Sequence, residues 1–399
     1  MRLIYVFLAL IFLFTGCKGR EITNNTDILA VLEENINTND EKQDDFEISD
    51  PFRILAAEIA SLMDDKLLAS QVIISGIDGN NKIPPHMERL LTQVPAGGIM
   101  LFRSNLNTNN DTIRSFLTDV SRFVNEKSGI PPFIAVDHEG GIVNRFINGV
   151  ASLPSASSYW QVYQQEGWNY ALEKIEKDSF RAGSEIYSLG VNMNFAPIAE
   201  YLIEENRVFL QYRSYGPSPF FTAHAAAAFV RGMDNAGVLC VIKHFPGSAG
   251  SDPHYFPSVF DMDMADLRLL VSPFTALINR GVRAVMAAHT YVPQIDDVIA
   301  SLSPFVMQNW LRGELGFDGI IISDDFNMAA AGSLSPQQAA VNSIIAGTDM
   351  ILVWQHQLLI TYNAVIAALN EGRLPRERLV DAASKIIYEK LRMGLMKAP

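Results

Sequence analysis

The chain has 399 residues, of which 48% are hydrophobic and 19% are charged. This composition excludes an intrinsically disordered protein and is sufficient for a large buried core. The formal net charge is −13, but ten acidic residues and one lysine lie between residues 21 and 50, so most of the negative charge belongs to one short segment. The rest of the chain is close to neutral, and we predict no nucleic-acid partner.

The first 17 residues have the pattern of an export signal. Arg2 precedes an apolar run, Leu3 to Phe14, that is too short to be a comfortable membrane span. Small residues then lead to Cys17, an arrangement that resembles a bacterial lipoprotein signal, in which the cysteine is lipidated and becomes the mature N-terminus. The alternative is an ordinary secretory signal or an uncleaved anchor. We predict an exported protein, held by Cys17 on the periplasmic or cell-surface side of a bacterial membrane.

Residues 18–50 are predicted to form an acidic, disordered linker. The segment is rich in Asn and Asp, and Phe46 is its one aromatic residue. We expect a single catalytic domain over residues 51–399. The second cysteine, Cys240, lies inside an apolar run and is expected to be a small buried side chain. Two cysteines provide neither a disulfide framework nor a metal cluster.

Eight short apolar runs follow one another from residue 71 onward. They are QVIISGI (71–77), GGIMLF (97–102), PFIAVD (132–137), VNMNFAP (191–197), VLCVIKHF (238–245), RAVMAAH (283–289), GIIISDD (319–325) and DMILVW (349–354). Each run is continuously apolar, which is typical of a strand buried on both faces in a parallel sheet. Segments of helical character separate them, including 111–127, 171–190 and 304–316. This alternation predicts a (β/α)8 TIM-type barrel.

An open, doubly wound α/β sheet is the alternative architecture. No GxGxxG motif follows the first run, which argues against a dinucleotide-binding version of it. In a barrel the chemistry lies at the carboxyl ends of the strands. Polar residues stand at that end of five runs: Asp137, His138, Glu139, Asn194, Glu200, Lys243, His244, His289, Asp324 and Asp325. Their repetition at one end of the sheet predicts an active site there.

Five motifs resemble glycoside hydrolase family 3, and most closely its β-N-acetylhexosaminidase branch. In chain order they are VDHEGGIVNRF, QYRSYG, KHFPG followed by DPH, AVMAAH and LGFDGIIISDDFNM. The resemblance implies a retaining exo-β-N-acetylglucosaminidase that removes terminal β-linked N-acetylhexosamine from peptidoglycan fragments or similar glycans. It implies a covalent glycosyl-enzyme intermediate, and we expect neither a cofactor nor a metal ion.

The same resemblance assigns the nucleophile to Asp324, the first aspartate of SDDF. Its alternative role is that of a helix N-cap at a strand–helix turn, which is common for aspartate. Asp325 is better placed as a cap or as a first-turn acid.

The general acid/base is implied to be a histidine–aspartate pair on the loop after the fifth strand. Here that loop reads KHFPGSAGSDPHYFP, so the pair is His254 and Asp252. Histidine titrates near neutrality, so it can protonate a leaving oxygen and later deprotonate water. The loop departs from the family, because Ser248 and Ala249 stand where His-Gly is usual and the stretch before DPH is shorter.

Sugar binding is implied for five further residues: Asp137, Arg145, Arg213, Lys243 and His244. Charged groups suit vicinal hydroxyls because charge-assisted hydrogen bonds are strong and directional. The alternative for Lys243 and His244 is a structural ion pair at the barrel mouth. Glu139 is interpreted as structural, bonding the backbone near Gly140 and Gly141. His289 is interpreted either as a sugar contact or as a hydrogen-bonded barrel histidine.

Three other functions remain open. A β-glucosidase or β-xylosidase of the same family usually carries a second α/β domain that supplies the acid/base, and too few residues follow the barrel runs for such a domain. A phosphorylase would use phosphate in place of water. A lipid-anchored, non-catalytic saccharide-binding protein would keep the sugar contacts without the chemistry. We expect a monomer.

Overall fold

The computed structural model describes residues 50–146, 150, 152–250, 255–327 and 334–397. The predicted signal with Cys17 and nearly all of the predicted linker lie outside the described residues. The described part begins with helix α3 (Pro51–Leu62), whose first turn is capped by the Asp50 carboxylate accepting from the Phe52 N–H at 3.0 Å. Within the described part, no helix is long and apolar enough to cross a membrane.

All eight predicted strands form, and they pair in parallel in the order β10-β1-β2-β3-β4-β5-β7-β9. Their bounds are β1 Ile73–Gly76, β2 Gly98–Leu101, β3 Phe133–Val136, β4 Met193–Asn194, β5 Leu239–Phe245, β7 Ala284–Ala287, β9 Ile320–Ser323 and β10 Ile351–Val353. A parallel bridge between Ile322 and Met350 joins the two ends of this order. The sheet is therefore closed into a barrel, which confirms the predicted fold and excludes the open doubly wound alternative.

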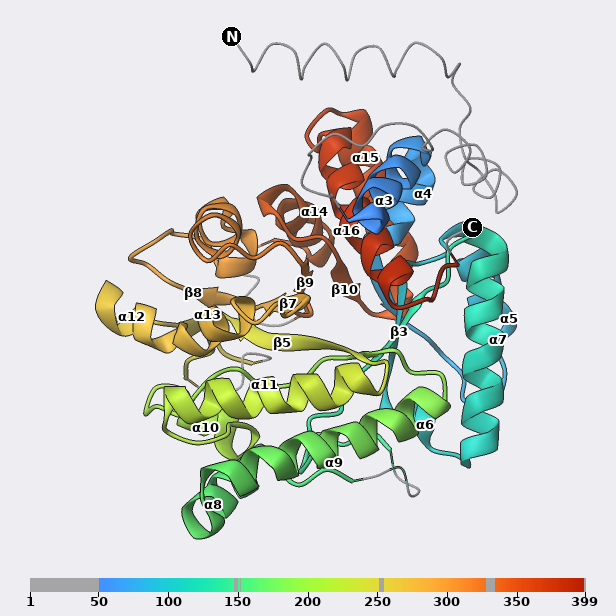
Figure 1. Ribbon diagram of the computed structural model, residues 1–399. Helices are drawn as coiled ribbons and strands as arrows, with labels where there is room; N and C mark the ends of the chain where they lie inside the picture. The colour runs from blue at the N-terminus through green and yellow to red at the C-terminus, as the bar shows by residue number, and fades with distance from the viewer. Residues whose placement is uncertain (1–49, 147–149, 151, 251–254, 328–333, 398–399) are drawn as a thin grey trace, which may run out of the picture.

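Helices cover the outside of the barrel (Figure 1). In that view α5 and α7 lie on the right, α9 and α11 below, α12 and α13 on the left, and α14 to α16 with α3 and α4 above. Besides α3, their bounds are α4 Asp65–Gln71, α5 Pro85–Gln93, α6 Arg103–Leu106, α7 Asn110–Ser128, α8 Ala156–Glu166, α9 Trp168–Ser188, α10 Arg207–Leu210, α11 Pro219–Asn235, α12 Met264–Leu270, α13 Ser272–Ile278, α14 Pro336–Ala346, α15 Leu358–Asn370 and α16 Arg376–Arg392. Shorter helical turns are η1 Gln211–Arg213, η2 Ala300–Leu302 and η5 Gln355–Gln357.

The helices begin and end where the sequence provides the signals. Helix α7 starts after Asn109, whose side chain accepts from the Thr112 N–H, and it ends at Gly129 with φ 73°. The predicted helix over 304–316 differs in its winding, because Phe305–Glu314 (η3) forms a π-helix. It is followed by Gly316 with φ 69°, so the predicted glycine stop is present.

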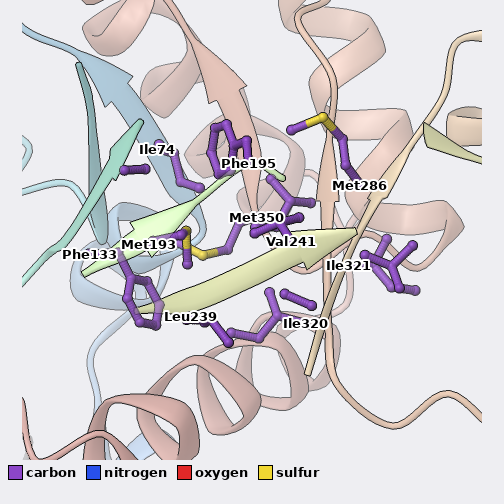
Figure 2. Packing of buried hydrophobic residues seen from close by; sticks show 14 of the residues in the cluster. Ile74, Phe133, Met193, Phe195, Leu239, Val241, Met286, Ile320, Ile321 and Met350 are labelled. Atoms are coloured by element: carbon purple, nitrogen blue, oxygen red, sulfur yellow. The ribbon is translucent and has the colours of Figure 1, made fainter. Parts of the chain in front are cut away.

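The core consists of apolar side chains on both faces of the strands. Every residue of β1, β2, β3, β5, β7 and β9 is buried. Figure 2 shows such side chains, including Ile74, Val241 and Ile320, packed in one cluster. Cys240 belongs to this core, and burial raises the pKa of its thiol. Continuous apolar runs are required here because neither face of the strands meets water.

Lys390 of α16 is a buried lysine whose neighbours at the amino-terminal end of the barrel are uncharged. Its Nζ donates to Gln71 Oε1 and to the Gly97 carbonyl, each at 3.0 Å, and lies 5.0 Å from the centre of the Phe133 ring. Burial without a carboxylate partner lowers its pKa to about 7. The folded protein therefore holds this lysine as a neutral amine above about pH 7.

This gives a prediction for stability against pH. Between about pH 7 and the ordinary lysine pKa of 10.5, the unfolded chain binds the Lys390 proton and the folded chain does not. The free energy of unfolding should therefore rise with pH across this window, by up to about 1.4 kcal/mol per pH unit. Denaturant titrations at pH 7 and pH 9.5 measure the rise. Lys390→Met should flatten it, and an unchanged slope in that variant would contradict the assignment.

Candidate active site

The carboxyl ends of the strands bring together the sequence-predicted site residues that the structure describes: Asp137, Arg145, Arg213, Lys243, His244 and Asp324. Asp137 follows β3, Lys243 and His244 directly precede the last residue of β5, and Asp324 follows β9. Asp252 and His254 lie outside the described residues.

A β-bulge presents Lys243 and His244 at this end of the barrel. Ile242 pairs with Val285 and Phe245 pairs with Ala287, so two residues of β5 face one residue of β7. On the other side of β5, the Lys243 backbone hydrogen-bonds residues 197 and 199, which follow β4. The Lys243–His244 peptide bond is cis. Bulges redirect side chains, and this one places two consecutive polar residues at the barrel mouth.

Lys243 bridges two carboxylates. Its Nζ lies 2.7 Å from Asp137 Oδ1 and 2.6 Å from Glu139 Oε1, and its side chain is 4% exposed. Burial alone would lower the pKa of this amine, but the two carboxylates raise it above its ordinary value. Arg145 approaches the other oxygen of Asp137 at 3.5 Å. The carboxylate of Asp137 is thus held between two cations, with its orientation fixed.

Glu139 has a larger role than its sequence interpretation gave it. Its carboxylate accepts two hydrogen bonds from Arg213, at 2.8 and 2.9 Å, in addition to the contact with Lys243. Burial would raise the pKa of Glu139, but the charges of Arg213 and Lys243 hold it well below its usual range. The interpretation of Glu139 as a backbone-bonding residue was therefore wrong: its carboxylate is the link between Arg213 and Lys243.

The turn that positions Glu139 depends on the glycines of DHEGG. Gly140 has φ 97°, and a Cβ on it would lie 2.3 Å from the Pro154 carbonyl oxygen. The Glu139 N–H donates to the Val143 carbonyl across this turn at 3.0 Å. The glycine is required by both the backbone conformation and the close approach of residue 154.

His244 is oriented by a buried glutamate, Glu200. The Nδ1 atom of His244 lies 2.7 Å from Glu200 Oε1, and the His244 backbone N–H donates to the same oxygen at 3.1 Å. Ser248, one of the residues that depart from the family pattern, donates its backbone N–H to Glu200 Oε2 at 2.6 Å. A carboxylate on Nδ1 fixes the imidazole so that Nε2 is directed away from Glu200. The sequence placed Glu200 at a strand end without assigning it a partner.

Asp324 is a partly buried carboxylate at the end of β9. Its Oδ1 accepts the Asp325 N–H at 2.8 Å, and its own N–H donates to the Ala287 carbonyl at 3.2 Å. Burial alone would raise the pKa of Asp324, but His244, the Asp325 N–H and Lys243 bring it below its ordinary value. Asp324 is therefore ionised at neutral pH, as a carboxylate nucleophile has to be.

The residues after Asp324 are braced by a polar network. Asp325 Oδ2 accepts from the indole N–H of Trp354, and Asp325 Oδ1 accepts from the Asn327 N–H at 3.0 Å. Asn327 and Gln357 exchange side-chain amide hydrogen bonds at 3.2 and 2.8 Å. Asp325 thus caps a local turn, close to its predicted role, and it ties the Asp324 segment to the end of β10.

His289 is a hydrogen-bonded barrel histidine, which is one of its two sequence interpretations, and the sugar contact stays a prediction. Its Nδ1 is 2.8 Å from Ser301 Oγ, and its ring stacks on Phe326 with centroids 4.6 Å apart. Its Nε2 is buried with no hydrogen-bond partner among the described residues. Burial lowers its pKa, so the ring is neutral at neutral pH. Among the residues that the structure covers, no group of three or more His, Cys, Asp or Glu side chains is arranged to hold a metal ion.

The loop that carries Asp252 and His254 is anchored at both ends. Before it, the Gly250 N–H donates to the Glu205 carbonyl at 2.6 Å, and the Ala249 N–H donates to Ser258 Oγ at 2.7 Å. After it, β6 (Ser258–Val259) pairs in parallel with β8 (Thr290–Tyr291). The described residues on the two sides of the loop, Ala249 and Ser258, are therefore in contact.

Comparisons with known proteins agree with this arrangement. The model of the glycosyl hydrolase family 3 N-terminal domain matches residues 62–388. A β-hexosaminidase of Stenotrophomonas maltophilia is 35% identical over 266 residues, which are 66% of this chain and 77% of that protein.

Two solved structures are also similar. One is a family 3 β-N-acetylglucosaminidase from Paenibacillus, with 30% identity and a TM-score of 0.78; the alignment covers 83% of this chain and 63% of that one. The other is NagZ from Neisseria gonorrhoeae in complex with N-trifluoroacetyl-D-glucosamine, with 26% identity, a TM-score of 0.68, and coverage of 82% of this chain and 93% of that one.

Proposed function

Because the chain belongs to glycosyl hydrolase family 3, we propose that it is a retaining exo-β-N-acetylglucosaminidase. Its substrates are glycans with a terminal β-linked N-acetylhexosamine, and peptidoglycan fragments are the substrate class that we favour. The observation that carries the proposal is Asp324, a partly buried, ionised carboxylate at the carboxyl end of β9, beside His244 and Lys243. The names of the Stenotrophomonas and Paenibacillus relatives support the choice of sugar.

The reaction proceeds by double displacement. Asp324 Oδ1 is held by the Asp325 N–H, and we assign the attack on the anomeric carbon to the second oxygen, Oδ2. The C–O bond to the leaving group breaks as the Asp324 ester forms, and the leaving oxygen takes a proton from the general acid. Water then attacks the anomeric carbon, gives a proton to the same residue acting as base, and releases Asp324 and the sugar with net retention.

His254, paired with Asp252, is our candidate for that acid/base. A histidine with an adjacent carboxylate has a raised pKa and a fixed tautomer, so it can donate a proton and take one back near neutral pH. Its support is the DPH motif and the anchoring of its loop at Gly250 and Ser258, beside the barrel mouth.

The sugar hydroxyls are recognised by the charged cluster. The Asp137 carboxylate accepts from hydroxyl groups, while Lys243, Arg213 and Arg145 donate to hydroxyl oxygens. His244 donates or accepts through Nε2. Because ion pairs orient these groups before substrate arrives, binding requires little rearrangement of the protein.

Aryl glycosides with different sugars test the function. We expect turnover of aryl β-N-acetylglucosaminide to exceed that of the aryl β-glucoside and β-xyloside by about 100-fold or more, since a site built for an amide loses affinity for analogues without it. The reverse preference would indicate a β-glucosidase or β-xylosidase. Stimulation by phosphate with release of a sugar phosphate would indicate a phosphorylase. Saturable sugar binding without turnover would indicate the non-catalytic alternative.

We also propose that the chain is exported and tethered to a bacterial membrane through a lipid on Cys17, and that it acts as a monomer. The support is the basic residue, apolar run and small residues that precede Cys17. Cys17→Ser should move the protein from the membrane fraction to the soluble exported fraction and abolish incorporation of labelled fatty acid. Equal labelling of the variant would refute the anchor, and light scattering of the detergent-solubilised protein tests the monomer.

A further inference from the structure

Helix α10 places an aromatic ring beside the candidate active site. The ring of Phe209 lies under the guanidinium of Arg213, with 4.8 Å from the Arg213 Cζ atom to the ring centre. It also contacts the ring of His244, with centroids 5.7 Å apart. Phe209 is partly exposed, so it belongs to the wall between the charged cluster and solvent.

The position of Phe209 is fixed by its neighbours in the chain. Asn206, which precedes α10, is fully buried, accepts the Ile203 N–H at 2.9 Å and donates to the Tyr201 carbonyl at 2.9 Å. Leu210, which follows Phe209, is also fully buried. The ring is therefore presented by a segment with a buried residue on each side.

The charged cluster and the aromatic ring suit different parts of a substrate. Asp137, Lys243 and Arg213 provide hydrogen-bonding groups for hydroxyls. A phenyl ring offers an apolar face, on which a pyranose C–H face or an aryl ring stacks. Val208 and Tyr212, close to Phe209 in the chain, are 62% and 63% exposed. In an exo-acting enzyme the terminal sugar occupies the inner cluster, and the rest of the substrate passes outward.

We propose that Phe209 forms one wall of the subsite for the leaving group and selects leaving groups that contain a ring, either a second pyranose or an aryl group. The inference rests on the proposed function. The competing role for Phe209 is to hold Arg213 in place, which would affect every substrate equally because all substrates share the terminal sugar.

Three substrates with the same terminal sugar separate the two roles. They are an aryl β-N-acetylglucosaminide, a β-linked disaccharide of N-acetylglucosamine, and methyl β-N-acetylglucosaminide, which has no ring in its leaving group. For Phe209→Ala we expect kcat/KM to fall about 3- to 10-fold on the first two, as for loss of one stacking contact, and less than about 2-fold on the methyl glycoside. Phe209→Trp should keep the wild-type preference for substrates whose leaving group contains a ring over the methyl glycoside. Inhibition by free N-acetylglucosamine should not change.

Phe220→Ala is the matched control. Phe220 is another aromatic residue at this end of the barrel, 64% exposed and stacked on Trp168 instead of on Arg213. Phe220→Ala should leave kcat/KM unchanged on all three substrates. If Phe209→Ala loses equal activity on all three substrates, or none on any, the inference is overturned. Phe209→Leu provides the same comparison should the alanine variant unfold. If the wild type cleaves none of the three substrates, the proposed function is refuted instead.

Discussion

Asp324→Asn should abolish turnover while the fold is retained. The substitution keeps the size of the side chain and the hydrogen bond from the Asp325 N–H, but it removes the negative charge that attacks the anomeric carbon. Without a nucleophile no glycosyl-enzyme forms, and we expect kcat/KM on an aryl β-N-acetylglucosaminide to fall by at least about 10⁴-fold. Initial rates measure the loss, and thermal unfolding shows whether the variant is folded.

The neighbouring Asp325→Asn is the control, because the two aspartates are adjacent and the substitution is the same. Asp325 binds Trp354 and Asn327, and it shapes the segment without reaching the anomeric carbon. Its loss should lower the rate by about 10-fold or less, as for a weakened supporting hydrogen bond. A fluorinated sugar that traps the intermediate should add mass to the wild type and to Asp325→Asn only. Labelling of Asp324→Asn would assign the nucleophile to another residue.

The strands could be predicted from the sequence because most of the runs are apolar until their carboxyl ends. A run such as GIIISDD has no polar residue that could face water until it ends, so it has to be covered on both sides. Once eight such runs are arranged in parallel, their polar ends meet at one face, and this placed Asp137, Lys243 and Asp324 together correctly.

The partners of these residues could not be predicted in the same way. Glu139 bonds Arg213, 74 residues later in the chain, and Glu200 bonds His244, 44 residues later. No local pattern links such positions, because the pairing depends on how the closed barrel staggers its strands. The bulge in β5 is likewise a product of pairing with β7. Glu139 was therefore misinterpreted, and Glu200 was noted without a role.

The charged cluster has a consequence for energetics. Asp137, Glu139, Lys243 and Arg213 carry two negative and two positive charges and form a chain of ion pairs, from Asp137 to Lys243 to Glu139 to Arg213. Each is largely removed from water, so each is stabilised by its partners and not by solvent. Removing one member leaves the opposite charge buried without compensation. The same groups that orient a sugar are for this reason also expected to stabilise the fold.

Lys243→Met should therefore damage both stability and activity. It leaves Asp137 and Glu139 without their shared cation, and we expect the free energy of unfolding to fall by about 3–5 kcal/mol at pH 7. The pKa of Glu139, depressed in the wild type, should rise. In the wild type the contribution of Glu139 is present above about pH 4.5 and is lost as pH falls below it, and the variant should lose part of this acid dependence. We also expect kcat/KM to fall by about 100-fold or more, since a donor to the sugar is removed.

Lys390→Met is the matched control, because it replaces a second buried lysine at the opposite end of the barrel. Lys390 contacts the neutral groups Gln71 and Gly97, and its pKa is lowered to about 7, whereas the pKa of Lys243 is raised. Replacing Lys390 should leave kcat/KM within about 2-fold of wild type. It should not lower the free energy of unfolding at pH 7, because the loss of two hydrogen bonds is offset by removal of a lysine whose lowered pKa opposes folding at that pH. Equal losses of stability in the two variants, with activity kept in both, would mean that the Asp137 and Glu139 carboxylates do not contribute to the effect of replacing Lys243. If the prediction holds, the ion pairs at the carboxyl end account for the difference between the two lysines.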